Sequence, residues 1–282
     1  MSGFSPDWLA LREPVDHRSR DAVLAGKVVA LFTGRPQVSV VDLGCGAGSN
    51  IRATYKLLPA EQSWTLVDYD ARLLAVARER LAAWADTCTA DGEALRLAKD
   101  DRRLHVGFRQ ADLTKDLDRA LAGATGAAPD LVTASAFFDL CSDAFIRRFA
   151  QAVAERGAAF YTVLTYNGQQ TWAPAHPADA ALRHFFHAHQ AGDKGFGAAA
   201  GPGAAGVLES AFETLGYDVA EGDSSWRLGR DDSGLINELA KGYAGAVAET
   251  GKVHAGTLAE WSGIVRTSAV VGHTDTLAVA TR

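Results

Sequence analysis

VSVVDLGCGAGSN, residues Val38 to Asn50, is the stretch that decides the fold of this 282-residue chain. A β-branched apolar run reaches an acid, Asp42, and glycines follow at the alternating positions Gly44, Gly46 and Gly48. A buried strand that enters a glycine-rich turn and then a helix is typical of a cofactor site. Glycine lets the backbone approach a ligand closely, and a helix N-terminus attracts anionic groups. The stretch therefore predicts an α/β fold that holds a cofactor at the strand end.

Two kinds of cofactor compete for this turn. The dinucleotide fingerprint G-x-G-x-x-G would place its third glycine where the chain has Ser49, and Gly48 comes one residue early. The carboxylate of Asp42 would also repel two phosphates. S-adenosylmethionine instead carries a sulfonium and an ammonium that suit an acid, and a carboxylate that suits the following helix start. The turn favours S-adenosylmethionine, and a nicotinamide oxidoreductase is the less favoured reading.

Apolar runs alternate with helical periodicity through the first half of the chain. The runs lie at 38–41, 64–67, 104–108, 131–133 and 160–164, and the helical patterns at 51–58, 71–85 and 143–155. Strands that alternate with helices of this length imply parallel βαβ units in one sheet covered on both faces. The polar segment 86–103 interrupts this order as either a helix end or a hairpin insertion.

The flanking regions are mostly helical. Residues 8–32 read as two helices separated at Pro14. Beyond the fifth run we expect a turn-like segment at 169–177, helices at 178–190, 202–215 and over much of 231–270, and strands near 217–220 and at 276–280. The economical reading is a single domain over 1–282. It has an N-terminal helical lid at 1–35, a cofactor-binding half at 36–166 and a substrate-side half with a helical insert at 167–282.

Two further acids end predicted strands. Asp68 follows the second run, where a carboxylate can bind both ribose hydroxyls, and Tyr69 beside it can pack on adenine. Asp112 follows the third run and can accept from the adenine amino group, with Leu113 packing alongside. Acids after strands also cap helices, and Asp68 alone fits a nicotinamide cofactor as well. Together with Asp42, however, they line the sheet edge where α/β folds bind ligands.

Five segments, in order, resemble the class I S-adenosylmethionine-dependent methyltransferases: VVDLGCGAGSN, WTLVDYDARLLAVAR, FRQADLT, PDLVTASAFFDL and AFYTVLTY. The resemblance implies a Rossmann-like, doubly wound, seven-stranded sheet that is mostly parallel, with 276–280 as its antiparallel last strand. It implies S-adenosylmethionine as cofactor and S-adenosylhomocysteine as product. It also implies cofactor contacts from Asp42, Gly44, Gly46, Asp68, Tyr69, Asp112, Leu113 and Ser135, with Cys45 contributing only its backbone and small size.

The segment after the fourth strand limits the acceptor. It reads Ser135-Ala136-Phe137-Phe138, not the Asn/Asp-Pro-Pro-Tyr/Phe motif of nucleobase and glutamine amino-group methylation. Phe137 and Phe138 are candidate substrate walls, with core packing as the alternative. Asp139 is a candidate to orient or deprotonate the acceptor, with a helix N-cap as the alternative. Tyr166 follows the fifth strand, at another edge where a substrate can bind.

The stretch HFFHAHQAGDKGFG adds candidates from the second half. His184 and His187 share a helix face and are candidate general bases, and His189 is a candidate substrate contact. Lys194 and Phe196 lie among glycines that suit a lid over the ligand. No HExxH register is present, so we predict no metal site. Outside this stretch, Arg20 can meet the cofactor carboxylate, with a solvated charged face as the favoured alternative. Trp226 can line a substrate pocket, with core packing as the alternative.

The charge and composition of the chain limit the classes of partner that we expect it to bind. The net charge is −6 and the sequence pI about 5.7, without a basic run, which argues against nucleic acid. We recognise no apolar span and no export signal, and the three cysteines form no CxxC pair, so a cytoplasmic location without membrane contact is the default. We therefore expect methyl transfer to oxygen or nitrogen of a small molecule. A non-catalytic S-adenosylmethionine-binding subunit and methylation of protein or RNA are the alternatives, and the pattern specifies no oligomeric state.

Overall fold

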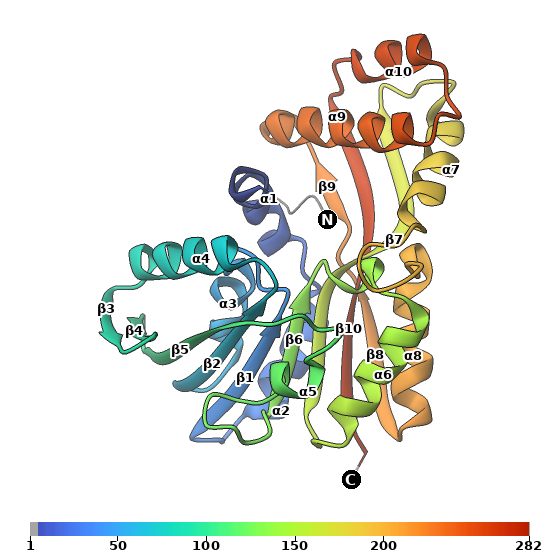
Figure 1. The fold of residues 1–282 in the computed structure, drawn as a ribbon. Helices are drawn as coiled ribbons and strands as arrows, with labels where there is room; N and C mark the ends of the chain where they lie inside the picture. Colours follow the sequence, from blue (N-terminus) through green and yellow to red (C-terminus); the bar gives the residue numbers. More distant parts are fainter. Residues whose placement is uncertain (1–4, 282) are drawn as a thin grey trace.

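The computed structural model describes residues 5–281, and these form one ten-stranded sheet beneath a helical cap (Figure 1). The strand order is β3-β4-β5-β2-β1-β6-β7-β10-β8, and β9 pairs with β10 beside this path. The strands are β1 (Gln37–Leu43), β2 (Glu61–Asp68), β3 (Thr87–Asp91), β4 (Ala94–Lys99), β5 (Arg102–Gln110), β6 (Leu131–Ser135), β7 (Ala159–Ala173), β8 (Tyr217–Asp223), β9 (Trp226–Leu228) and β10 (Ser268–Ala280).

The centre of the sheet is parallel and its last strand is antiparallel. Strands β5, β2, β1, β6 and β7 pair in parallel, whereas β10 runs antiparallel to both β7 and β8. The predicted doubly wound fold with an antiparallel last strand is confirmed. The predicted count of seven is exceeded by three short strands. Residues 86–103 form the hairpin β3–β4 at the sheet edge, which decides between the two readings of that segment, and β9 is the third addition.

Helices cover both faces of the sheet. They are α1 (Pro6–Arg18), α2 (Ala22–Phe32), α3 (Ser49–Thr54), α4 (Ala71–Trp84), α5 (Leu117–Ala120), α6 (Asp143–Ala154), α7 (Asp179–Gln190), α8 (Ala204–Thr214), α9 (Ser233–Glu249) and α10 (Ala255–Ser262). Buried side chains of α2 and α4 join one apolar cluster, and those of α5, α6 and α8 join a second cluster on the other face. In Figure 1, α6 and α8 lie on the near face of the sheet, and α2 and α3 lie on its far face. No helix among residues 5–281 is long and apolar enough to cross a membrane.

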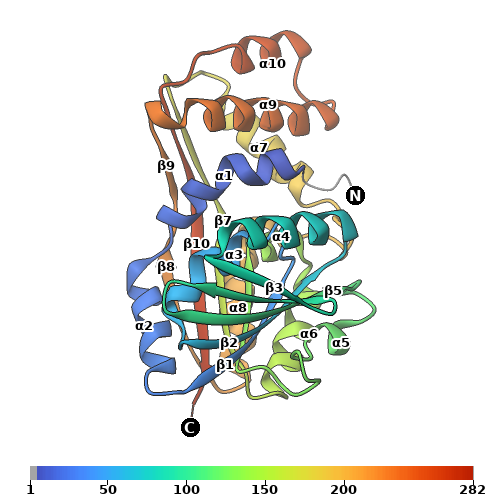
Figure 2. The same cartoon turned by 90° about the vertical axis from the view of Figure 1, so that its left-hand side faces the viewer.

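Two strands continue beyond the sheet and support the helices above it. The upper ends of β7 and β10 carry α7, α9 and α10, a unit that we call the cap (Figures 1 and 2). Trp261 is fully buried there, against Trp172 at 5.1 Å and Tyr243 at 5.5 Å between ring centroids. The turn predicted at 169–177 is therefore wrong for residues 169–173, which extend β7. The predicted last strand likewise covers only the end of β10.

The N-terminal helix runs through its proline. Helix α1 is continuous across Pro14, so the break predicted there is wrong. A proline within a helix removes one backbone donor, and here the chain instead leaves the helix after Arg18. The side chain of Asp21 then caps α2 by accepting from the backbone of Leu24. Residues 1–4 of the predicted lid lie outside the described residues, and the division of the chain into a lid and two halves stays a prediction.

Candidate active site

The glycine turn joins β1 to α3 in a backbone conformation that favours glycine. Gly44, Gly46 and Gly48 have φ values of +58°, +52° and +74°. A Cβ atom on Gly44 would lie 2.8 Å from Cδ2 of Phe137, so a side chain there would collide with a ring from the end of β6. The backbone of Cys45 donates to the carbonyl of Val67 over 3.0 Å, which ties the turn to β2. The Cys45 side chain is buried, and burial raises the pKa of its thiol, in keeping with a purely steric role.

Asp68 connects the end of β2 to this turn. Its Oδ2 accepts from the backbone of Gly46 over 2.8 Å, and its Oδ1 accepts from the backbone of Asp70 over 2.9 Å. Burial raises the pKa of this carboxyl group. Each oxygen keeps a lone pair, so the carboxylate can still accept hydroxyl donors from a ligand. Tyr69, the next residue, is 62% exposed, which leaves its ring open to a flat partner.

Asp112 lies just beyond the end of β5. Its Oδ1 accepts from the backbone and hydroxyl of Thr114, and Lys115 lies 2.9 Å from its Oδ2. These contacts lower the pKa of Asp112 to about 2, so the group is ionised at neutral pH. Leu113 is buried beside it. Because β5, β2 and β1 are neighbours in the sheet, Asp112, Asp68 and Asp42 lie at three adjacent strand ends, as predicted.

Asp42 is held beneath the turn. It is fully buried, its Oδ1 accepts from Asn50 Nδ2 over 2.7 Å, and its Oδ2 has no partner among the described residues. Burial raises its pKa to about 7. Arg20 donates to the side chains of Asn50 and Thr54, each over 2.8 Å, and so supports the turn from below. These contacts occupy the end of the guanidinium and do not support the predicted contact of Arg20 with the cofactor carboxylate.

Helix α1 lies over the glycine turn (Figure 2). Glu13 forms a two-pronged ion pair with Arg52 at 2.6 and 2.7 Å, and His17 Nε2 lies 2.9 Å from Ser49 Oγ. A Cβ atom on Gly46 would lie 3.3 Å from Leu9. One face of α1 therefore covers the place where a cofactor would approach the turn.

Comparison with known proteins identifies a methyltransferase domain at the glycine turn. Residues 40–126, which hold β1, the turn and the three acids, match a family model described as a methyltransferase domain. This part of the chain therefore matches a methyltransferase domain, in agreement with the resemblance of its motifs to class I S-adenosylmethionine-dependent enzymes. The cofactor is therefore S-adenosylmethionine, and the nicotinamide reading is set aside. A search of curated protein sequences finds no match to the chain.

Two solved structures share the fold of this methyltransferase. The YcgJ protein of Bacillus subtilis is 14% identical and superposes with a TM-score of 0.51 over 94% of this chain and 99% of that one. A Bacillus halodurans C-125 protein with a provisional methyltransferase assignment is 11% identical, with a TM-score of 0.50 over 91% and 99% of the two chains. At such identities the likeness concerns the fold alone.

Asp139 is the buried acid just beyond β6, in the region that the sequence predicts to face the methyl acceptor and that we call the acceptor side. It follows β6 and accepts from Gln190 Nε2 of α7 over 3.0 Å. Burial raises its pKa to about 6, against the opposing effect of the nearby Arg12 guanidinium. The N-cap alternative is wrong, because Ser142 caps α6 by accepting from the backbone of Phe145. Asp139 therefore does not serve as the N-cap of α6.

The two phenylalanines before Asp139 have different places. Phe137 packs edge-on against Phe196 at 5.4 Å between ring centroids and touches the glycine turn, so it stays a candidate wall. Phe138 is wholly buried between Phe149 and Phe160, and its prediction as a substrate wall is wrong. Ser135 ends β6 beside this pair.

The candidates on and after α7 separate as well. His187 Nε2 lies 3.0 Å from the hydroxyl of Tyr166 on β7. His184 is exposed and packs on its neighbour Phe185, so its prediction as a general base is not supported. His189 pairs with Glu249 of α9 at 2.9 Å, and its prediction as a substrate contact is wrong because this pair ties two cap helices together.

The predicted glycine-rich lid is an ordered turn. Asp193 Oδ1 accepts from the backbones of Gly195 and Gly197, and Asp193 forms a bridge with Ala198. Phe196 packs between Phe137 and Phe145, next to the acceptor side. Lys194 is half-buried and makes no hydrogen bond to any described residue.

Arg12, Asp16 and His273 surround the predicted pocket residue Trp226, and these three were not identified from the sequence. Trp226 of β9 donates to Asp16, which also pairs with Arg12, and the Arg12 guanidinium lies 5.0 Å from the Trp226 ring centroid. His273 of β10 is buried 5.1 Å from Trp226, with its Nδ1 unpartnered among the described residues. The spacing of Arg12 and Asp16 on α1 shows a helical pair, but nothing in the sequence joins them to β9 and β10.

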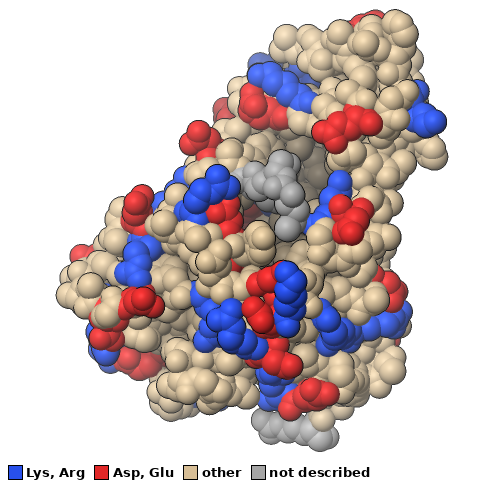
Figure 3. Space-filling model, in the orientation of Figure 1, with Lys and Arg blue, Asp and Glu red and all other residues tan. Residues whose placement is uncertain are grey.

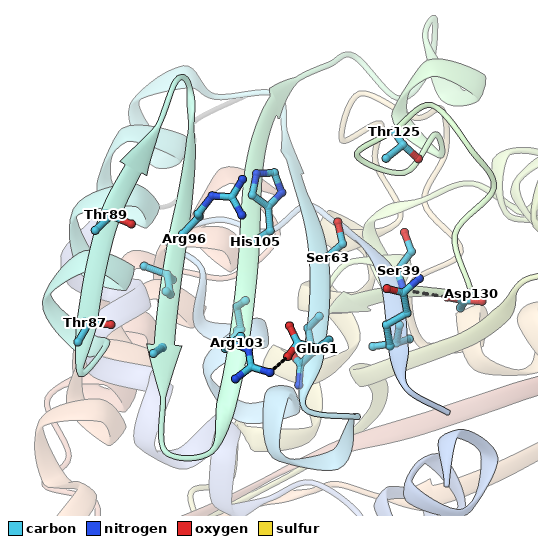
Figure 4. A pocket seen from close by; sticks show the side chains of 16 residues that line it. Ser39, Glu61, Ser63, Thr87, Thr89, Arg96, Arg103, His105, Thr125 and Asp130 are labelled. Carbon is cyan, nitrogen blue, oxygen red and sulfur yellow. Dashed lines mark hydrogen bonds and ion pairs between the residues drawn. The ribbon is translucent and has the colours of Figure 1, made fainter. Parts of the chain in front are cut away.

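A separate cavity lies at the other end of the sheet. Its volume is about 540 Å³, and it opens over the polar face near the strand starts, where Ser39, Ser63 and His105 project from β1, β2 and β5 (Figure 4). Its charges are paired, as with Arg103 and Glu61. Open α/β sheets bind ligands at the carboxyl ends of their strands. We therefore place the active site at the glycine turn.

Proposed function

We propose that this methyltransferase moves a methyl group to an oxygen or nitrogen atom of a small molecule, and that Asp139 holds the acceptor. The observation that carries the proposal is the buried Asp139 carboxylate, two residues after Phe137, whose ring touches the glycine turn. A carboxylate in this place accepts a hydrogen bond from an O–H or N–H group and turns the acceptor's lone pair toward the methyl group.

The residues of the turn fit the cofactor. Asp68 keeps lone pairs for ribose hydroxyls, Tyr69 leaves a ring face open, and the buried Asp42 suits a positively charged ligand. S-adenosylmethionine supplies a sulfonium-bound methyl group, which passes to the acceptor as the carbon–sulfur bond breaks and sulfur keeps the electron pair. Helix α1 and the cap exclude water from this transfer, which depends chiefly on alignment.

Charge supports a small acceptor. On the face drawn in Figure 3, basic and acidic side chains alternate and leave no continuous basic track. Binding along a nucleic-acid backbone needs such a track, and the chain as a whole is acidic. A small-molecule acceptor and a cytoplasmic location are parts of this proposal.

The test combines binding and turnover. We expect S-adenosylhomocysteine to bind in calorimetry and NADH not to bind. We expect radiolabelled methyl transfer from S-adenosylmethionine to a panel of small phenols, amines and carboxylic acids, and Asp139→Asn to lower turnover roughly 100-fold without weakening S-adenosylhomocysteine binding. Binding without transfer to any compound, but with transfer to proteins or RNA of a cell extract, would refute the proposal. Binding without any transfer would indicate a non-catalytic subunit.

A further inference from the structure

A buried tyrosine and a half-buried histidine meet next to Asp139. Tyr166, on β7, is 6% exposed, and its hydroxyl lies 3.0 Å from Nε2 of His187 on α7. The pair therefore connects the interior of the acceptor side to a side chain nearer the surface of the cap.

The tautomer of His187 decides the direction of the hydrogen bond in this pair. The imidazole lies against the backbone of Gly168, and its Nε2 faces the Tyr166 hydroxyl. A proton can pass from Tyr166 to His187 only when the ring hydrogen is on Nδ1, because Nε2 then accepts from the Tyr166 hydroxyl.

The position of Gly168 makes this arrangement specific. Its φ of +87° favours glycine, and a Cβ atom would lie 2.9 Å from Pro202 and 3.5 Å from Cε1 of His187. The imidazole therefore packs directly on a backbone that only glycine provides here.

Helix α7 presents two polar groups to the same place. His187 and Gln190 are three residues apart on one helix face, and they contact Tyr166 and Asp139. The backbone of Tyr166 also makes a hydrogen bond that lowers the pKa of Asp139. Neighbouring side chains on one face of α7 therefore contact the hydroxyl of Tyr166 and the carboxylate of Asp139.

The surroundings keep the imidazole neutral. Burial lowers the pKa of His187, and so do Arg183 and His184 on the same helix. The groups that face the pair from other elements are Asp139 beyond β6, Tyr243 of α9 and His273 of β10. Asp139 is the one acid among these three groups, and it contacts Gln190. No ion pair among these groups therefore holds the proton on His187, which can pass it to solvent.

We propose that Tyr166 and His187 form a proton relay for methyl transfer, and that the acceptor is a weakly acidic hydroxyl on an aromatic ring. As the acceptor oxygen bonds to the methyl carbon, its proton passes to Tyr166 Oη and the Tyr166 proton passes to His187 Nε2. The carbon–sulfur bond breaks, sulfur keeps the pair, and the imidazolium releases its proton to solvent. This inference rests on the proposed function.

Both the chemistry of the relay and the aromatic side chains near it favour this acceptor class. A phenol, with a pKa of about 10, can lose its proton to such a relay as the new bond forms, whereas an aliphatic alcohol holds its proton too tightly. Phe137, two residues before Asp139, and Tyr166 bring aromatic rings to this region, against which an aromatic acceptor can pack.

The first test measures the tautomer of His187 in the absence of a methyl acceptor. Long-range proton–nitrogen NMR of the full chain with S-adenosylhomocysteine, assigned with His187→Gln, reports the tautomer of His187. We expect hydrogen on Nδ1. Hydrogen on Nε2 would mean that His187 donates to Tyr166, and it would overturn the relay.

The second test reads turnover with phenol, 4-nitrophenol and benzylamine as probes and radiolabelled S-adenosylmethionine as donor. We expect methylation of the phenols, a roughly 100-fold loss of kcat in Tyr166→Phe and His187→Gln, unchanged S-adenosylhomocysteine binding, and partial rescue of His187→Gly by added imidazole. His189→Gln is the matched control on the same helix and is expected to keep wild-type activity.

The outcomes separate the two proposals. Methylation of benzylamine alone, with His187→Gln at the wild-type rate, would overturn the relay and leave the proposed function standing. No methylation of any small molecule would instead remove the proposed function itself. If His187→Gln fails to fold by circular dichroism, turnover of Tyr166→Phe decides, and His187→Asn replaces His187→Gln for the NMR assignment.

Discussion

Gln190 of α7 donates its side-chain amide to Asp139 at the end of β6 over 3.0 Å, and this bond joins the cap to the sheet edge. It is one of the contacts that lower the pKa of Asp139, against the larger effect of burial, which raises it to about 6. The cap thus influences the protonation of the acid that we assign to acceptor binding.

Replacing Gln190 by methionine should shift the pH dependence of turnover. The variant keeps the volume but removes the donor that favours the charged carboxylate, so the pKa of Asp139 should rise. If the carboxylate is the active form, the acid limb of the kcat/KM profile should move to higher pH, while S-adenosylhomocysteine binding stays unchanged. Gln151→Met, on the exposed face of α6, is the control. An unmoved acid limb would contradict the role of Asp139.

Gly44→Ala should damage the cofactor site. The new Cβ would meet Phe137 at 2.8 Å, in a backbone conformation that disfavours alanine. We expect S-adenosylhomocysteine to bind at least 10-fold more weakly in calorimetry, with a loss of about 1–3 kcal/mol in the free energy of unfolding. Gly245→Ala is the matched control: this glycine lies in α9 with open space around it, so alanine should stabilise the helix by about 0.5–1 kcal/mol. Equal binding by both variants would show that the turn does not contact the cofactor.

Local patterns were sufficient to predict the centre of this fold. The apolar runs, the glycine turn and the acids at strand ends depend on residues close together in sequence, and the sheet order places Asp42, Asp68 and Asp112 on adjacent strands. The extension of β7 and β10 into the cap was missed because residues 169–173 are mostly polar. Their pairing with β10, far away in sequence, makes them a strand.

The acceptor side was only partly predictable, because it is made by distant contacts. Asp139 follows β6, and Tyr166 follows the apolar run that begins β7, so both were found by position. Gln190 reaches Asp139 from 51 residues away, and Trp226 reaches Asp16 from 210 residues away. The three-residue spacing of Gln190 from His187 was the one local signal available. Composition could not show that Phe138 faces the core while Phe137 faces the turn.

The charge of Asp42 should cost stability at neutral pH. Its folded pKa of about 7 lies above its ordinary value of 3.8, so the folded state binds more protons between these values. The free energy of unfolding in the absence of cofactor should therefore be highest below about pH 4 for this group and fall as pH rises to 7, by an upper bound of roughly 4 kcal/mol. Asp42→Asn should remove this fall.

Urea denaturation at pH 5, 6.5 and 8 measures the effect of Asp42. We expect Asp42→Asn to be more stable than wild type at pH 8 and less different at pH 5, and to bind S-adenosylhomocysteine more weakly. Asp218→Asn, an exposed change on β8, should follow the wild-type curve. A variant that is less stable than wild type at pH 8 would contradict the burial penalty.

Helix α1 should open locally when its ion pair to the turn is weakened. Glu13 and Arg52 keep only 18% and 7% of their side-chain surface exposed, so Glu13→Gln leaves a mostly buried guanidinium without its counter-charge. The cost should be about 1–3 kcal/mol, borne largely by α1. Hydrogen exchange over residues 6–18 should then speed up, and bound S-adenosylhomocysteine should slow it again if α1 closes over the cofactor. Asp143→Asn, which breaks the exposed pair with Arg147, should change neither exchange nor stability by more than about 0.5 kcal/mol. Unchanged exchange in α1 of Glu13→Gln would mean that Leu9 and His17 suffice to hold the helix on the turn.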